Sequence, residues 1–149
     1  MKSQKVIPQC VGGEVENLKF YDITDRRNPV LLGRHDVFGT LRAPRSPHEM
    51  YIWNDASRAL VFLSAPPGGP SFEVIDATDP RTPTLAASWN PILEGGIVRR
   101  DEESILHSVG LSEDGRTAYL SHQTAGLLLA DVSALPAVTL LTPPANALR

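Results

Sequence analysis

Apolar and β-branched residues fall in short runs of strand length, separated by polar segments that are rich in Pro, Gly, Asp and Asn. The runs at 59–63 and 127–130 are almost wholly apolar, which is typical of strands covered on both faces. Helical spacing explains neither run, and 13 prolines at strand edges and turns argue against long helices. The pattern predicts an all-β protein.

The segment 18–25 recurs at 71–79 and, in a weaker form, at 126–133. The copies are 54 and 55 positions apart, measured from one shared aspartate to the next: Asp22, Asp76 and Asp131. Between the copies, a hairpin at 48–64 matches one at 107–121. Such a constant period indicates an architecture built from stacked, similar units.

One unit contains four short strands, which matches the blade of a β-propeller made of antiparallel meanders. The strands are predicted at about 48–53, 58–64, 71–77 and 83–89, and then at about 106–111, 116–121, 126–132 and 137–142. We therefore expect one partial propeller domain over 1–149, with an incomplete blade at 1–34 and blades at 48–89 and 106–142. Closed propellers use about four to eight blades, so the ring is incomplete.

The segment 7–13, which precedes the first copy, has the pattern of a strand remnant whose partner lies before Met1. Blades without neighbours expose apolar faces that tend to associate. We therefore expect either a fragment of a longer product or a subunit that completes its ring with other copies.

In its fullest form the repeat reads Val-Ile-Asp-Ala-Thr-Asp-Pro, at 74–80, with Pro83 after it. This pattern resembles the repeat of the LVIVD-repeat β-propeller proteins, in three copies over about residues 17 to 142. The third copy departs from it, because Ala134 replaces the second aspartate and Pro136 comes two positions early. The resemblance implies a bacterial-type propeller of generally unassigned function and transfers no catalytic residue.

The shared aspartate of the repeat has a structural explanation. An aspartate followed two positions later by Thr or Ser can accept the backbone N–H that a tight turn leaves free. We therefore predict that Asp22, Asp76 and Asp131 close turns. The segment 22–25 lacks the glycine and the distal glutamate of a calcium-binding loop.

Two histidines, His48 and His107, stand at equivalent places at the start of the first strands of successive blades. In propellers this strand lines the central channel, so we expect both histidines and Glu49 at the channel mouth. Imidazole can bind a transition metal or transfer a proton, and we expect the two side chains to lie nearer to each other than to His35. The alternative is a structural role, in which each histidine bonds a neighbouring loop. His35 and His122 are expected to be solvated.

Four arginines fall in the connections on the same rim: Arg42, Arg45, Arg99 and Arg100. They could form a positive patch that attracts an anionic ligand, or they could be ordinary surface charge, since the acids at 101–103 offset two of them. Trp53 and Trp89 are expected to fill gaps between blades and not to stack on a ligand.

The remaining composition excludes several classes of protein. A formal net charge of −3 without a basic block argues against a nucleic-acid partner, and no apolar run is long enough to span a bilayer. The amino terminus has no signal-peptide pattern, and the compartment stays open. Cys10 is the single cysteine, and the sequence contains neither a Gly-x-Ser-x-Gly nor a His-Glu-x-x-His motif.

Two functional hypotheses follow. The first is a non-enzymatic propeller module that acts as a binding or scaffold platform for a protein or a small molecule, without a cofactor. The second is a metal-dependent propeller enzyme, distantly similar to the selenium-binding proteins, in which His48 and His107 hold a transition metal. Metal analysis of the purified protein separates the two.

Overall fold

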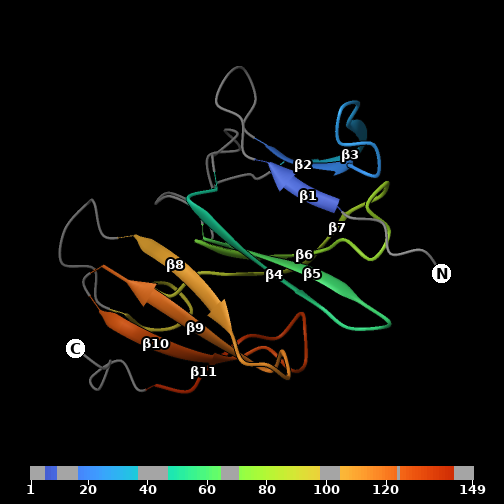
Figure 1. Ribbon diagram of the computed structural model, residues 1–149. Coiled ribbons are helices and arrows are strands. Elements are labelled where there is room, and N and C mark those ends of the chain that lie inside the picture. The colour runs from blue at the N-terminus through green and yellow to red at the C-terminus, as the bar shows by residue number, and fades with distance from the viewer. Residues whose placement is uncertain are drawn as a thin grey trace.

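The computed structural model describes residues 6–9, 17–36, 47–64, 71–97, 105–123 and 125–142. Within these ranges the chain forms strands in three antiparallel sheets and no helix (Figure 1). The all-β prediction is confirmed, and the sheets form an open arrangement, as expected for an incomplete set of propeller-like blades. The described part of the chain accordingly holds no helix with the length and apolarity needed to cross a bilayer.

The three sheets follow one another along the chain. Sheet 1 contains β1 (Val6–Gln9), β2 (Asn17–Asp22) and β3 (Val30–Asp36). Sheet 2 contains β4 (Glu49–Asn54), β5 (Ala59–Ser64), β6 (Phe72–Asp76) and β7 (Thr84–Trp89). Sheet 3 contains β8 (Leu106–Leu111), β9 (Thr117–His122), β10 (Gly126–Asp131) and β11 (Thr139–Leu140).

Sheets 2 and 3 are the two predicted four-stranded meanders, each strand pairing with the next along the chain. Their hairpins close as the sequence predicts. Gly115 adopts a φ of 68°, and its N–H donates to the Ser112 carbonyl at 2.9 Å. In the other hairpin, the Asp55 carboxylate accepts the backbone N–H of Ser57 at 2.7 Å. Glycine and aspartate therefore supply the turn geometry that each hairpin needs.

Sheet 1 corrects one expectation and leaves another untested. Its third strand continues to Asp36, beyond the predicted boundary at residue 34. The first strand pairs on one side with β2, which follows it in the chain: Val6 pairs with Asp22, and Gln9 pairs with Lys19. Its other edge has no partner among the described residues, and a partner before Met1 stays a prediction. The expected remnant began at Ile7, whereas residues 10–13 lie outside the described ranges.

The last strand is shorter than predicted, because β11 covers two residues where 137–142 was expected. Ala134 has no side-chain oxygen to accept a turn N–H, and the turn closes through the Ala137 N–H to the Ala134 carbonyl at 3.0 Å. Beyond β11, the Thr142 hydroxyl accepts the Leu129 N–H at 2.7 Å. The hydroxyl of Thr142 thus takes the place of a backbone acceptor in the pairing of β10 with its outer neighbour.

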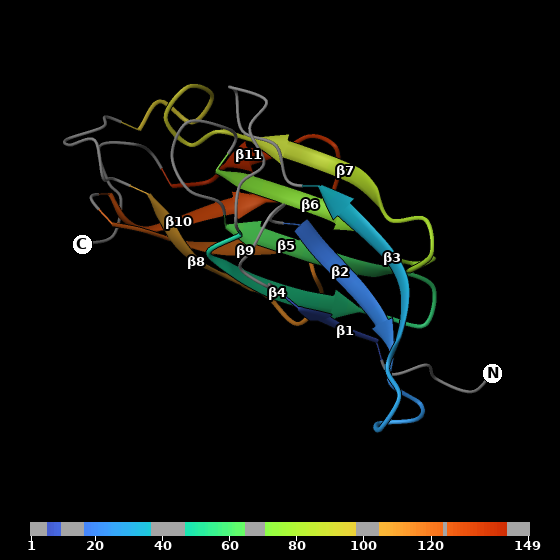
Figure 2. The same ribbon diagram turned by 90° about the horizontal axis from the view of Figure 1, so that it is seen from above.

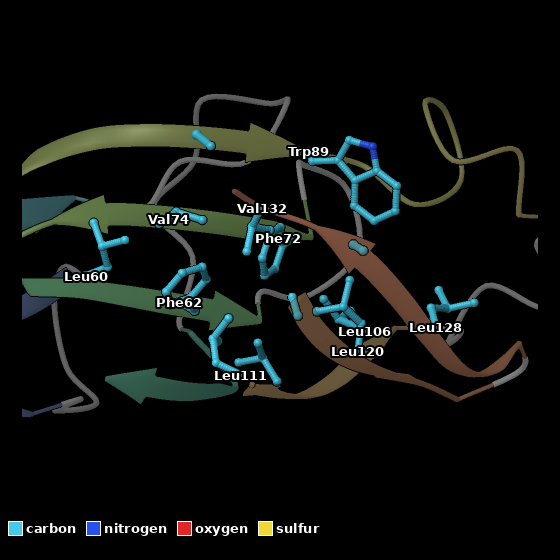
Figure 3. Packing of buried hydrophobic residues seen from close by; sticks show 14 of the residues in the cluster. Leu60, Phe62, Phe72, Val74, Trp89, Leu106, Leu111, Leu120, Leu128 and Val132 are labelled. Carbon is cyan, nitrogen blue, oxygen red and sulfur yellow. The ribbon is translucent and has the colours of Figure 1, made fainter. Parts of the chain in front are cut away.

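Sheet 2 lies between the other two sheets (Figure 2). Its buried side chains point alternately to one neighbouring sheet and to the other. Leu60, Phe62, Phe72 and Val74 pack with sheet 3 residues such as Leu120 (Figure 3). Side chains of the opposite face pack against Leu18 and Phe20 of β2: Val61, Leu63, Ile75 and Ala77. Each large apolar side chain buried in this way contributes about 1.5–3 kcal/mol, so packing between sheets is the main stabilising term.

Candidate functional site

The first strands of sheets 2 and 3 place His48 and His107 at equivalent positions. Glu49, the residue after His48, pairs with Ser64 at the end of β5. Ser108, the residue after His107, pairs with Ser121 in β9. Both histidines are exposed. The equivalence that the sequence predicts is confirmed.

A bulge turns His107 out of the regular ladder. The pairing of β8 with β9 passes from Leu106 directly to Ser108, so His107 has no opposite residue. Its carbonyl accepts two hydrogen bonds from sheet 2 instead, from the Ser64 hydroxyl at 2.9 Å and from His48 Nδ1 at 3.1 Å. These bonds join the two sheets at the rim.

The two imidazole rings lie against each other, with centroids 4.3 Å apart and planes inclined by 56°. Because a carbonyl can only accept, Nδ1 of His48 carries the proton, and Nε2 of the neutral ring holds a free electron pair. His107 Nδ1 lies 2.8 Å from the Ser108 hydroxyl. Both rings are therefore oriented through Nδ1, which is the arrangement that presents Nε2 to a ligand.

Glu49 is fixed through its backbone, not through its carboxylate. The Ser64 hydroxyl, which is fully buried, accepts the Glu49 N–H at 3.1 Å and lies 3.3 Å from the Glu49 carbonyl. The Glu49 side chain is exposed. Among the described residues no group of three or more His, Cys, Asp or Glu side chains could hold a metal ion, so Glu49 does not complete one with the two histidines.

The four candidate arginines, Arg42, Arg45, Arg99 and Arg100, lie outside the described residues. The expectation that His35 and His122 are solvated is wrong. His122 ends β9 with only 3% of its surface exposed, and its Nδ1 accepts the Ala125 N–H at 3.3 Å. His35 is half-buried in β3, and burial lowers its pKa despite the neighbouring Asp36. Neither burial could be predicted from the sequence, because it depends on contacts beyond the local segment.

Both tryptophans fill gaps between elements, as predicted. The Trp53 indole N–H donates to the Glu113 carbonyl at 3.1 Å, which links β4 to the β8–β9 turn. Trp89 is buried and meets the Phe72 ring edge-on, with centroids 6.4 Å apart. Both rings thus make contacts within the protein.

The repeat aspartates close turns, as predicted. Asp22, Asp76 and Asp131 accept the backbone N–H two residues later, at 2.8, 3.0 and 2.8 Å. Side-chain and backbone hydrogen bonds lower the pKa of Asp22 and Asp131. For Asp76, burial raises the pKa, but the bonds from Thr78 and Arg58 outweigh it and the net shift is downward.

Two residues with a functional or energetic role were missed. Ser64 could have been found from its match with Ser121 in the aligned hairpins. Glu73 is a charge within the apolar strand β6, only 4% exposed, and its Oε2 has no hydrogen-bond partner in the described structure. Burial raises the pKa of Glu73 to about 7.

The paired imidazoles offer two nitrogen ligands, or two hydrogen-bonding groups, on one exposed edge. Catalytic metal sites commonly use three protein ligands, so the described residues alone do not fit a metal centre. The arrangement suits contact with a polar or anionic group of a ligand. Neither a scan of protein-family models nor a search of curated proteins finds a match for this chain.

Proposed function

We propose that this chain is a non-enzymatic binding module built from propeller blades, with the His48–His107 edge as its point of ligand contact. The observation that carries the proposal is the pair of exposed rings 4.3 Å apart, supplied by equivalent positions of adjacent sheets. The Nδ1 bond of His48 joins the two sheets, as the structural alternative expects, and it also leaves Nε2 of that ring for a ligand.

The surroundings of the pair support binding more than catalysis. The Ser64 hydroxyl is buried and donates to the His107 carbonyl, so it is not available as a nucleophile, and the Ser108 hydroxyl, 2.8 Å from His107 Nδ1, orients that ring. The neutral His48 ring offers an acceptor at Nε2, whereas a protonated ring offers a donor and a positive charge. The edge can therefore contact carboxylate or phosphate groups, and the arginines predicted on this rim would strengthen such contacts.

The propeller interpretation adds a second partner. Blades normally cover each other on both faces, so we infer that further blades, from the same polypeptide or from another copy, complete the ring. The ligand edge lies at the junction of two sheets, and its geometry depends on their packing.

Histidine side-chain NMR tests the proposed edge, with inorganic phosphate and Zn²⁺ as separate probes. We expect phosphate to shift the imidazole signals of His48 and His107 and to leave the buried His122 unchanged. The same titration of His35→Asn should be unaltered, whereas His48→Asn and His107→Asn should lose the response.

Two results contradict the proposal. The first is a stoichiometric transition metal in the purified protein that is lost in His48→Asn and His107→Asn, because it would favour the metal-dependent enzyme. The second is the absence of any response to both probes, which would remove this edge as a binding site.

A further inference from the structure

Sheet 2 packs against its two neighbours in different ways. At the junction of sheets 2 and 3, Ser64 and His48 donate to the His107 carbonyl. The Trp53 indole N–H donates to the Glu113 carbonyl farther along the same junction. At the junction of sheets 1 and 2, β2 lies over sheet 2 and buries apolar side chains against it (Figure 2). These side chains are Leu18, Phe20, Val61, Leu63, Ile75 and Ala77.

Glu73 is an ionisable residue buried at the junction of sheets 1 and 2. It pairs with Leu63, and it alternates with Phe72 and Val74, which pack toward sheet 3, so its side chain points toward sheet 1. Only 4% of its surface is exposed, and its Oε2 has no hydrogen-bond partner among the described residues. The equivalent position in sheet 3 holds Leu128, which is fully buried. A carboxyl thus stands where the repeat elsewhere has an apolar side chain.

The ionisable groups of sheet 1 do not compensate for this carboxyl. His35 faces sheet 2, since it pairs with Leu18, and burial lowers the pKa of its ring and favours the neutral form. Asp22 lies at the far end of β2, where it accepts the Thr24 N–H and lies near the charge of Arg81. β1 contains no ionisable residue. Three other charged residues of β2 and β3 lie on the opposite face: Lys19, Arg34 and Asp36.

The neighbours of Glu73 within sheet 2 do not compensate for it either. Leu63 and Ser88 pair with it on the two adjacent strands, and neither is ionisable. Burial is the cause that raises the pKa of Glu73 to about 7. No positive group in the described part of the chain therefore holds the charged form in place.

Burial treats the two forms of the Glu73 carboxyl differently. A carboxylate without a partner is costly to bury, whereas a protonated carboxyl can remain under sheet 1 at a much smaller cost. Release of sheet 1 lets water reach the carboxylate and removes this cost. We propose that the packing of sheet 1 on sheet 2 depends on the protonation of Glu73, and that loss of the proton releases sheet 1 while sheets 2 and 3 stay together. The release exposes the apolar face of sheet 2 that is turned away from sheet 3.

The size of the effect follows from the proton affinity of Glu73 in the two arrangements. Its pKa is about 7 in the packed structure and takes the ordinary value of 4.5 once water reaches the carboxyl. Between pH 5 and pH 8, the equilibrium constant for release of sheet 1 should therefore increase by about 70-fold. His35 acts in the opposite direction, because release lets its ring bind a proton more readily. Variants that all retain His35 isolate the contribution of Glu73.

Hydrogen exchange of the full chain, corrected for the intrinsic exchange rate at each pH, measures the release. From pH 5 to pH 8, the amides of β2 and β3 should lose about 70-fold more protection in the wild type than in Glu73→Gln. Low concentrations of urea distinguish release of one sheet from unfolding of the whole chain, because global unfolding exposes more surface and depends more steeply on urea. We expect a weak urea dependence for β2 and β3 and a steep one for β5 and β6.

Three further variants control the measurement. Glu73→Leu introduces the residue found at Leu128, and it should behave like Glu73→Gln, which it replaces if the glutamine variant does not fold. Lys19→Gln removes a charge on the opposite face of β2 and should keep the pH response of the wild type. Gly33→Ala places a Cβ against the Pro80 carbonyl oxygen, so it should lower the protection of β2 and β3 at both pH values.

Three results would overturn the proposal. Equal pH responses in the wild type and in the Glu73 variants would remove the role of Glu73. Exchange of β2 and β3 with the same protection and urea dependence as β5 and β6 would show that the chain unfolds as a whole. A loss of protection in Gly33→Ala that spreads over all three sheets would also show that sheet 1 is not released as a separate unit.

Discussion

Replacing Glu73 with glutamine should remove most of the pH dependence of stability between pH 5 and pH 8. Glu73 lies on the face of sheet 2 that sheet 1 covers, and its Oε2 has no hydrogen-bond partner in the described part of the chain. Burial of the charged form is the cause that raises its pKa from the ordinary 4.5 to about 7. Glutamine keeps the shape of the side chain and cannot ionise.

Glu73 binds its proton more tightly in the folded chain than in the unfolded chain, and this difference sets the direction of the pH dependence. In the unfolded chain Glu73 ionises at its ordinary pKa, whereas in the folded chain it stays protonated until about pH 7. The stabilisation that comes from protonated Glu73 is therefore fully present below pH 4.5 and decreases as the pH rises. Above pH 7 the free energy of unfolding levels off at a lower value. With about 1.4 kcal/mol for each pKa unit, the loss between pH 5 and pH 8 is about 2.5 kcal/mol.

Urea denaturation of the wild type and of Glu73→Gln at pH 5 and pH 8 measures this loss. Burial lowers the pKa of His35, so its contribution has the opposite sign and the folded state gains stability from it as the pH rises. His35 is present in both proteins, so the difference between them isolates Glu73. The repeat aspartates titrate below their usual range and do not interfere. Parallel pH dependences would refute the reasoning and would show that Glu73 has a partner.

Gly115→Ala should lower the free energy of unfolding by about 2 kcal/mol, because the positive φ disfavours a side chain and the new Cβ would lie 2.7 Å from Trp53 Cζ2. Urea denaturation measures this loss, and Gly110→Ala is the control because a Cβ there meets nothing within 4 Å. Equal losses of stability in the two variants would contradict the prediction. Asp76→Ala should lower the free energy of unfolding by about 2 kcal/mol and Asp76→Asn clearly less, since an amide oxygen can still accept the turn N–H. Equal losses in urea denaturation would mean that the ion pair with Arg58, and not the turn hydrogen bond, stabilises the fold. Phe62→Ala should cost about 4 kcal/mol in thermal unfolding, and a loss under about 1 kcal/mol would contradict the packing between sheets 2 and 3.

Local chemistry accounts for what could be predicted from the sequence. A turn depends on the few residues that form it, so the carboxylates of Asp22 and Asp131 could be assigned to their backbone partners without a structure. The proximity of His48 and His107 followed from the repeat, because equivalent positions in stacked units face the same side.

The features that the sequence did not predict depend on contacts between units. Glu73 occupies a position that holds Lys19 in sheet 1 and Leu128 in sheet 3, so the repeat alone does not show that it is buried without a partner. The burial of His122 depends on its surroundings in sheet 3 and not on its neighbours in sequence. The bulge that directs the His107 carbonyl toward sheet 2 leaves no mark in the spacing of apolar residues.

The covering of sheet 2 on both faces gives the molecule an uneven resistance to local opening. Amide protons of β5 and β6 can exchange with solvent only after a neighbouring sheet has moved away, because both strands are central in their sheet and almost wholly buried. Among the described residues, sheets 1 and 3 are each covered on one face only, by sheet 2, and can open without disturbing the sheet between them. Fluctuations of the molecule are thus concentrated at its two ends, and the middle sheet is the last part to be lost.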